Sequence, residues 1–448
     1  MLNINIPDEV NFILKKLNSR GFEAYIVGGC VRDSMMNITP KDYDICTSAV
    51  PEQIESCFED FKTLEVGKKH GTISVIIGKN IYEITTFRVD GEYLDSRHPQ
   101  KVEFSRDVIT DLSRRDFTIN AMAYSEGSGL IDPFGGKADL KDRLIKCVGS
   151  PEKRFSEDAL RILRGLRFAS RFDFALEQET VNAVHALKAS LNNIAAERIR
   201  EELIGITAGE SAERILLEYR DVFAEIIPEL KPCFDFEQRT PHHYLDVYAH
   251  IARTVCNIEP EPLLRITMLL HDVGKPKVCT TDKNGRRHFK GHPLISAQMA
   301  DDILRRLRFP NDFISDCVTL IEYHDVRFKG SKTALKRVIG KIGEQNTQRL
   351  FKIQRADILA QSDYRREQKL NDLNSAEIQF EEIIKNNECC SLKQLSISGE
   401  DVKSLGIAEG KEIGNILNEL LEKVISGEVE NDREELIKII ILLSNKIL

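Results

Sequence analysis

Apolar and polar residues follow two different rhythms along the chain, and the change between them lies near residue 150. Before it, apolar residues form short runs, such as residues 73–77 and 81–85, and residues 78–80 between these runs predict a hairpin. Beyond it, apolar residues recur at every third or fourth position, as at Leu160 and Leu163, which indicates amphipathic helices. The pattern therefore predicts an α+β fold, with strands in the N-terminal part and a mostly α-helical remainder.

The length of 448 residues exceeds what one compact core holds and suggests about three domains. Pro228, Pro232 and Pro241 mark a connection over residues 226–242. We predict a strand-containing head, a helical neck, a histidine-rich region and a helical tail. Their boundaries are residues 1–140, 141–225, 226–365 and 366–448.

Two glycines and two aspartates near the N-terminus indicate a metal-dependent nucleotide site. Gly28 and Gly29 end a short apolar strand, so the backbone can approach a ligand, and the following helix N-terminus attracts phosphate. On a strand, Asp42 and Asp44 would point to one face and could meet one metal ion. The alternative is a surface turn followed by two solvated acids. Glu83 on the predicted hairpin is a candidate third carboxylate, and a plain polar strand residue is an equal interpretation.

Two further motifs offer groups that suit nucleotide binding. Arg114 and Arg115 supply bidentate donors for triphosphate oxygens. Asp158 and Arg161 are three residues apart, so we expect them on one face of a helix. A carboxylate accepts from an exocyclic amine and a guanidinium donates to a ring nitrogen or carbonyl, so the pair can accept cytosine and adenine and reject guanine and uracil. An ordinary ion pair within a helix is the alternative.

These motifs, in this order, resemble those of the class II tRNA nucleotidyltransferases, the CCA-adding enzymes, and of the related bacterial poly(A) polymerases. The resemblance covers residues 28–171, with a weaker match at residues 197–203. It implies a head like that of polymerase β, in which Asp42 and Asp44 are catalytic and bind Mg²⁺. The segment 88–102 corresponds to the flexible loop with which family members switch from adding C to adding A. The residues that the resemblance assigns to nucleotide binding are Gly28, Gly29, Arg32, Asp33, Arg114, Arg115, Asp116, Asn120, Asp158, Arg161 and Arg164.

Histidines are concentrated in one region, since seven of the ten lie between residues 242 and 324. His271 and Asp272 are adjacent after an apolar helix and can share a metal ion, and this arrangement resembles the HD superfamily of metal-dependent phosphohydrolases. Imidazole with carboxylate suits Mn, Fe, Ni, Co or Mg, and a bound metal would activate water against a phosphoester. The alternative is a degenerate HD fold that serves only as scaffold. The predicted ligands are His250, His271, Asp272, His292, His324 and Asp357; His242, His243 and His288 are expected at the surface.

Charge is unevenly distributed over the C-terminal half. The net charge of -8 argues against indiscriminate binding of nucleic acid. Residues 327–355 nevertheless hold nine Lys or Arg and one Glu, which fits either a polyanion site or a solvated helix face. Residues 366–448 hold ten basic and seventeen acidic residues. Their glycine breaks resemble the tRNA-binding tail of the family, and ordinary helix caps are the alternative; the glycines are Gly399, Gly406, Gly410 and Gly414.

Nothing in the sequence suggests a membrane or a secretory route. There is no apolar run of about 18 residues, the N-terminus lacks the pattern of a signal peptide, and the scattered cysteines indicate reduced thiols. We therefore expect a cytoplasmic protein without a membrane partner, and the sequence indicates no particular oligomeric state.

The sequence as a whole predicts template-independent addition or repair of the 3'-terminal CCA of tRNA. The expected partners are the tRNA 3' end, CTP and ATP, with Mg²⁺ in the head and a divalent metal, either Mg²⁺ or a transition metal, in the HD region, which would add a phosphohydrolase activity. The alternatives are an enzyme that adds only A, a poly(A) polymerase, and an HD phosphohydrolase whose head merely binds RNA.

Overall fold

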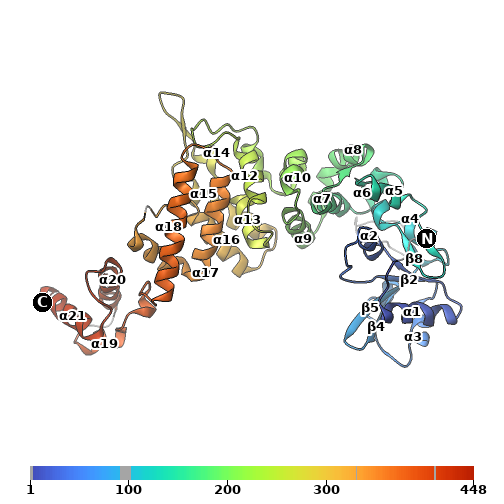
Figure 1. The fold of residues 1–448 in the computed structure, drawn as a ribbon, viewed down its shortest axis with the longest axis horizontal. Coiled ribbons are helices and arrows are strands. Elements are labelled where there is room, and N and C mark those ends of the chain that lie inside the picture. Colours follow the sequence, from blue (N-terminus) through green and yellow to red (C-terminus); the bar gives the residue numbers. More distant parts are fainter. Residues whose placement is uncertain (1–3, 91–101, 329, 408–409, 448) are drawn as a thin grey trace. The chain divides into compact units, whose positions relative to one another are not determined.

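The computed structural model describes residues 4–90, 102–328, 330–407 and 410–447 (Figure 1). The chain forms two compact units, Met1–Pro228 and Glu229–Leu448. Their border falls inside the predicted connection over residues 226–242. The finer division into head, neck, histidine-rich region and tail stays a prediction.

The first unit combines strands and helices, which confirms the predicted α+β class. Its helices are α1 (Asp8–Ser19), α2 (Gly29–Met35), α3 (Pro51–Cys57), α4 (Val108–Ser113), α5 (Gly136–Lys141), α6 (Pro151–Glu157), α7 (Leu160–Phe172), α8 (Gln178–Leu187), α9 (Ala196–Thr207), α10 (Ala212–Glu218) and α11 (Arg220–Ile226). Its strands are β1 (Ala24–Val27), β2 (Ile45–Thr47), β3 (Lys62–Leu64), β4 (Thr72–Ile77), β5 (Asn80–Thr86), β6 (Arg88–Asp90), β7 (Val102–Phe104), β8 (Ala123–Ser125), β9 (Gly129–Ile131), β10 (Leu144–Ile145) and β11 (Ala175–Leu176).

A seven-stranded sheet in the order β3-β4-β5-β2-β1-β8-β9 forms the centre of the head. The hairpin predicted from residues 73–85 is confirmed as β4 and β5, which pair antiparallel. β2 and β5 run parallel, with Ile45 opposite Ile84. This parallel pair brings the segments that precede Ile45 and Ile84 to the same edge of the sheet.

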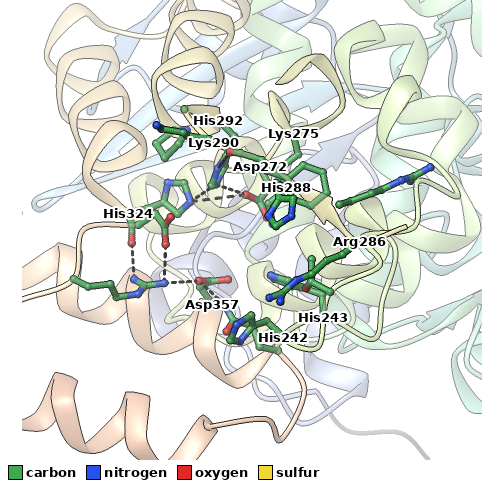
Figure 2. A pocket seen from close by; sticks show the side chains of 18 of the residues that line it. His242, His243, Asp272, Lys275, Arg286, His288, Lys290, His292, His324 and Asp357 are labelled. Carbon is green, nitrogen blue, oxygen red and sulfur yellow. Dashed lines mark hydrogen bonds and ion pairs between the residues drawn. The ribbon is translucent and has the colours of Figure 1, made fainter. Parts of the chain in front are cut away.

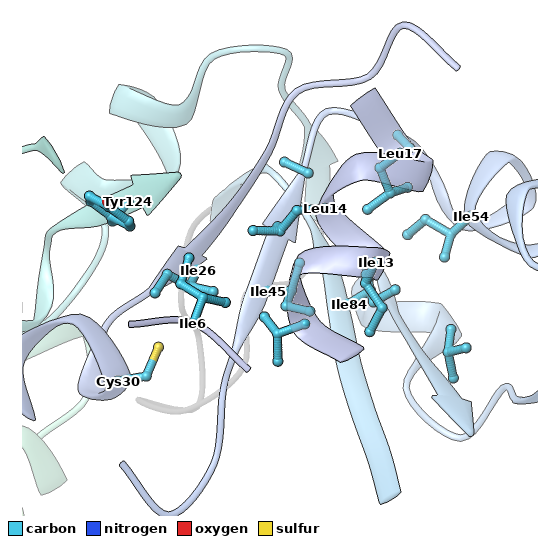
Figure 3. Close-up of a cluster of buried hydrophobic side chains, with 14 of the residues drawn as sticks. Ile6, Ile13, Leu14, Leu17, Ile26, Cys30, Ile45, Ile54, Ile84 and Tyr124 are labelled. Carbon is cyan, nitrogen blue, oxygen red and sulfur yellow. The ribbon is translucent and has the colours of Figure 1, made fainter. Parts of the chain in front are cut away.

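Both faces of the sheet are covered, because alternate residues of each central strand point to opposite sides. Ile26 of β1 and Ile45 of β2 pack against Ile13 and Leu17 of α1 in one buried cluster (Figure 3). Val27 and its neighbours on the other face join a second cluster with α4. Strand β1 is buried along its whole length, so the turn that follows it starts from a rigid base.

The helices α7 and α9 pack closely, and Gly209 lies at this contact. A Cβ added to Gly209 would lie 2.1 Å from Ser170 Oγ and 2.6 Å from the Ser170 carbonyl carbon. We expect Gly209→Ala to lower the free energy of unfolding by about 2–3 kcal/mol, because backbone must move to relieve the overlap. The change in the free energy of unfolding is measured by urea denaturation, with hydrogen exchange in peptides from α7 as the readout.

Gly127→Ala is the matched control, since an added Cβ there meets no atom within 4 Å. Its denaturation midpoint should equal that of the wild type. An unchanged midpoint for Gly209→Ala as well would contradict the close packing of α7 against the segment after α9.

The second unit is mostly helical, as the three- and four-residue spacing predicts. Its elements are α12 (Val247–Cys256), α13 (Pro262–Leu270), α14 (Lys275–Val278), β12 (Thr280–Thr281), β13 (Arg287–His288), α15 (His292–Arg306), α16 (Asn311–Tyr323), α17 (Lys332–Leu359), α18 (Arg366–Lys385), α19 (Gly399–Ser404), α20 (Lys411–Ser426) and α21 (Arg433–Ile447). α17 and α18 pack side by side (Figure 1). Gly343, with φ 81° and ψ 166°, breaks α17 into two segments.

Three local expectations are wrong. Asp42 and Asp44 do not lie on a strand, because β2 begins at Ile45. The segment 88–102 is not a loop throughout: its ends pair as β6 and β7, and residues 91–101 lie outside the described part. In the tail, Gly399 starts α19 and Gly414 lies inside α20, so only Gly406 and Gly410 stand between these helices.

No helix within the described ranges is long and apolar enough to cross a membrane.

Candidate functional site

The glycine turn after β1 is shaped by backbone conformation and by a close arginine. Gly28 has φ 79° and ψ -125°, a conformation that disfavours other residues, and α2 begins directly after it. A Cβ at Gly28 would lie 2.9 Å from Arg115 Nη1. The positive φ of this turn therefore favours glycine, and the Arg115 guanidinium would have to shift to admit a side chain.

Asp44 and Glu83 lie at the same sheet edge, because Ile45 pairs in parallel with Ile84. The pKa of the Asp44 carboxyl is raised by burial, and also by the charges of Asp42 and Glu83, against the opposing effect of Arg115. Carboxylates are ligands that suit Mg²⁺, although among the described residues the oxygens of these three do not all lie within 4.8 Å of one another. Asp42 and Asp44 both precede β2, so the predicted strand alternation does not place them on one face.

A buried polar network links α2 to α7. The Arg32 guanidinium donates to Asp33 at 2.8 Å and to Asn120 at 2.5 Å. Asn120 donates to Asp116 Oδ1 at 3.1 Å, and Arg164 Nε donates to Asp116 Oδ2 at 2.9 Å. Burial opposes ionisation of Asp116, but Arg164 and the neighbouring donors outweigh it and lower the pKa of this carboxyl. Five of the predicted nucleotide-binding residues thus form one continuous network.

Aromatic rings support the network at Arg32. The guanidinium carbon of Arg32 lies 5.1 Å from the ring centre of Phe168 and 4.9 Å from that of Phe172. The residue is only 5% exposed, so these rings and its two hydrogen-bond partners leave the side chain little freedom. Arg32 therefore fixes α2 against α7.

Asp111 holds the two predicted triphosphate arginines, and the sequence interpretation missed it. Its Oδ1 lies 2.8 Å from Arg114 Nη2, and its Oδ2 lies 3.4 Å from Arg115 Nη2. Although burial acts to raise it, the pKa of Asp111 is lowered by these arginines. The spacing of three and four residues before the arginines was the signal that could have revealed this carboxylate.

Asp158 and Arg161 do not share a helix, which corrects the expectation from their spacing. Asp158 lies between α6 and α7, and its carboxylate pairs with Arg198 at 2.8 Å. Arg161 donates to Glu157 at 2.7 Å and to the carbonyl oxygen of Arg114 at 3.1 Å. The two side chains therefore have separate partners, and the alternative of an ion pair between them is wrong.

The six predicted HD ligands converge from five separate parts of the second unit, and we call this group the Asp272 cluster. His250 lies on α12, His271 and Asp272 follow α13, and Asp357 lies near the end of α17. His292 starts α15 and His324 follows α16, and Figure 2 shows both turned towards Asp272. Every member is buried.

The atoms at the centre of the Asp272 cluster fit a metal site. His250 Nε2, His271 Nε2 and Asp272 Oδ1 are buried without a hydrogen bond, and Asp272 Oδ2 lies 2.6 Å from Lys275 Nζ. Buried polar atoms of this kind are costly unless a partner satisfies them, and imidazole with carboxylate is a ligand set for transition metals. Among the described residues, sets of three or more ligand atoms within 4.8 Å of one another occur around Asp272, whereas the head carboxylates form no such set.

Lys275 and His243 are part of this site and were missed. Lys275 Nζ lies 2.6 Å from Asp272 Oδ2 and receives a second partner in Gln238. His243 stacks edge-on against His250 at 4.8 Å, and burial with nearby Lys275 lowers its pKa to about 2. The expectation that His243 lies at the surface is therefore wrong, whereas His288 is exposed and contacts Asp282. Lys275 lies four residues after His271, and this spacing was the only feature of the sequence that could have revealed it as part of the site.

A cavity of about 530 Å³ opens over the Asp272 cluster (Figure 2). Its wall carries more positive than negative side chains, so it favours an anion that approaches the cluster. The cationic lining residues are Lys275, Arg286, Arg287, Lys290, Arg327 and Lys369.

Comparison with known proteins assigns three stretches of the chain to families. Residues 24–146 match the Poly A polymerase head domain, residues 173–234 match the "Probable RNA and SrmB- binding site of polymerase A", and residues 294–440 match tRNA nucleotidyltransferase domain 2. The first stretch contains the glycine turn, the carboxylates and most of the buried network.

Individual relatives extend the likeness over almost the whole chain. A CCA-adding enzyme of Ligilactobacillus salivarius is 34% identical over 98% of both chains, and one of Enterococcus faecalis is 30% identical over 95% of this chain and 93% of its own. A Bacillus stearothermophilus CCA-adding enzyme, solved in complex with CTP, aligns over 98% of this chain and 97% of its own at 26% identity, with a TM-score of 0.71. The chain belongs to the family of CCA-adding enzymes, which are nucleotidyltransferases.

Proposed function

We propose that this protein builds or repairs the 3'-terminal CCA of tRNA from CTP and ATP without a nucleic-acid template. The observation that carries the proposal is the 34% identity to a CCA-adding enzyme over 98% of both chains. The four regions would serve as nucleotidyltransferase head, neck, HD body and tRNA-binding tail. The ten free cysteines support a reducing, cytoplasmic setting.

Asp42 and Asp44, with Glu83 as the third carboxylate, would hold Mg²⁺ at the edge formed by β2 and β5. When bound, Mg²⁺ neutralises phosphate charge and lowers the pKa of the attacking hydroxyl. The 3'-oxygen of the RNA forms a bond to the α-phosphorus, and the bond from that phosphorus to the β-phosphate oxygen breaks, so pyrophosphate leaves. Arg114 and Arg115, fixed by Asp111, offer donors to the triphosphate.

Base selection would depend on Asp158 and Arg161. Cytosine and adenine both present an amine beside a ring-nitrogen acceptor, which a carboxylate and a guanidinium match, whereas guanine and uracil present the reverse order. Glu157 and the Arg114 carbonyl hold Arg161, and Arg198 holds Asp158. These fixed partners keep both groups in one orientation before a nucleotide arrives.

The segment 88–102 would allow the change from C to A addition, and its presence favours a complete CCA product. β6 follows directly after β5, the strand that carries Glu83, and β7 pairs with β6. The same site residues would also serve an A-adding enzyme or a poly(A) polymerase, and these are the alternative functions.

Three tRNA transcripts test the product: one ending before CCA, one after C and one after CC. Each receives CTP, ATP or both with Mg²⁺, and products are sized at single-nucleotide resolution. We expect growth of the first transcript by CCA and then arrest. Extension of only the last transcript by one A would make this an A-adding enzyme, and long ATP-dependent tails would make it a poly(A) polymerase.

A second activity is favoured by the Asp272 cluster beneath its cationic cavity. We propose that this cluster is an HD phosphohydrolase site, where water cleaves a phosphoester to an alcohol and phosphate. The buried, unsatisfied His and Asp atoms support a metal-binding role over a scaffold role. Asp272→Asn should abolish Mn²⁺-dependent hydrolysis of a phosphomonoester and leave CCA addition unchanged; hydrolysis equal to wild type would refute this role.

A further inference from the structure

The carboxylate of Asp111, on α4, joins the end of its own helix to the start of β6. Arg114 donates to Asp111 Oδ1 through Nε at 3.0 Å and through Nη2 at 2.8 Å. Arg115 Nη2 donates to Oδ2 at 3.4 Å. The backbone N–H of Arg88, the first residue of β6, donates to Oδ1 at 3.4 Å. Asp111 is 1% exposed, so these protein donors take the place of water around its carboxylate.

Asp111 is fixed in place and keeps its charge. Leu112, the next residue on α4, is fully buried with Phe87 in the cluster on one face of the sheet. Burial acts to raise the pKa of the Asp111 carboxyl, but the charges of Arg114 and Arg115 outweigh it and lower this pKa. The ionised carboxylate therefore determines where the two guanidinium groups lie.

Arg115 extends from Asp111 to the glycine turn and the carboxylate edge. Its Nη2 faces Asp111, whereas its Nη1 would lie 2.9 Å from a Cβ added to Gly28. Burial raises the pKa of the Asp44 carboxyl, and the charge of Arg115 opposes this rise. A shift of the Asp111 carboxylate would therefore move a cation that lies beside both the glycine turn and Asp44.

Arg114 connects Asp111 to Arg161, the arginine proposed to select the base. The side chain of Arg114 is held by Asp111, and its carbonyl oxygen accepts from Arg161 Nη2 at 3.1 Å. Arg114 is also the C-cap residue of α4, so the end of this helix sets the position of that carbonyl. Loss of the Asp111 charge would disturb both a donor for the triphosphate and an acceptor that orients Arg161.

We propose that Asp111 is a positioning residue that makes the grip on the triphosphate and the choice of base depend on each other. Arg114 and Arg115 would meet the triphosphate and Arg161 the base, whereas the oxygens of Asp111 are taken up by protein donors. The inference rests on the function proposed above and deepens it, because it assigns one carboxylate to two requirements of that site. The same carboxylate holds the start of the segment 88–102 beside the arginines.

Steady-state kinetics of Asp111→Asn test the proposal. The full chain extends a tRNA transcript that awaits its first C, with Mg²⁺ and either CTP or UTP. The amide loses the charge, and it has one acceptor oxygen where the carboxylate has two. We expect KM for CTP to rise about 10-fold and the CTP preference, the ratio of kcat/KM for CTP and UTP, to fall about 10-fold, with kcat for CTP changed less than about threefold. Asp111→Glu, which keeps the charge, should restore part of both values.

Asp107→Ala is the matched control for a purely structural role of α4. Asp107 is the exposed N-cap residue of this helix, and its carboxylate accepts from the backbone N–H groups of Ile109 and Thr110 at 3.0 and 3.2 Å. Its removal deletes the cap and should lower the melting temperature, but it leaves the carboxylate of Asp111 in place. KM for CTP and the CTP preference should equal those of the wild type.

Each outcome decides the proposal. Equal kinetic changes in Asp107→Ala would assign the effect to a weakened α4 and overturn the positioning role, as would a wild-type KM and preference in Asp111→Asn. A raised KM with an unchanged preference would also overturn it, because the two would then be independent. If Asp111→Asn melts below the assay temperature, Asp111→Glu takes its place, and wild-type values in that variant would overturn the proposal. A wild type that incorporates no nucleotide would instead overturn the proposed function, and this inference with it.

Discussion

Asp44→Asn is expected to reduce the rate of CTP incorporation at least about 1000-fold, equivalent to roughly 4 kcal/mol of transition-state stabilisation. Asp44 lies at the edge of β2 and β5 with Asp42 and Glu83 close enough to raise its pKa. An amide removes the charge that would hold Mg²⁺ there. Single-turnover extension of a tRNA transcript ending before CCA measures the rate.

The neighbouring carboxylates sharpen this prediction. Asp42→Asn should reduce the rate of CTP incorporation as much as Asp44→Asn does. The decrease of this rate in Glu83→Gln shows whether Glu83 acts as a third ligand. Glu59→Gln, an exposed carboxylate on the same head, is the matched control and should incorporate CTP at the wild-type rate. A near-normal rate in Asp44→Asn would mean that the metal site lies elsewhere.

Asp158→Ala is expected to lower the preference for CTP over UTP roughly 100-fold, because the carboxylate that accepts from the exocyclic amine is lost. The ratio of kcat/KM for the two nucleotides measures this, on a transcript that awaits its first C. Total incorporation falls less than the preference does, since the head carboxylates are unchanged. A preserved CTP preference would remove Asp158 from base selection.

Arg198 offers a second check on the same site, as a positioning residue. It pairs with Asp158 at 2.8 Å, so Arg198→Ala should weaken the preference for CTP less than Asp158→Ala, and Arg198→Lys should restore part of it. Asp221→Ala, which removes a carboxylate paired with Lys188 elsewhere in the unit, is the matched control. It should leave the preference unchanged.

Local patterns in the sequence were sufficient for the hairpin of β4 and β5, for the change from strands to helices and for the glycine turn. Each depends on residues close in the chain: alternation over a few positions, recurrence at three or four, or a positive φ at Gly28. The motif order likewise indicated the CCA-adding family and the carboxylates, although the strand predicted for Asp42 and Asp44 begins only after both of them, at Ile45.

Tertiary structure decided which side chains meet. The sequence by itself determined the ligand types of the Asp272 cluster, but only the packing of α12, α13, α15, α16 and α17 brings these side chains together around Asp272. Likewise, Asp158 and Arg161 look paired at a spacing of three residues, but the break between α6 and α7 separates them and Arg198, forty residues further on, becomes the partner of Asp158. Spacing along a chain predicts contact only while one helix continues, and contacts between distant elements depend on how their buried faces pack.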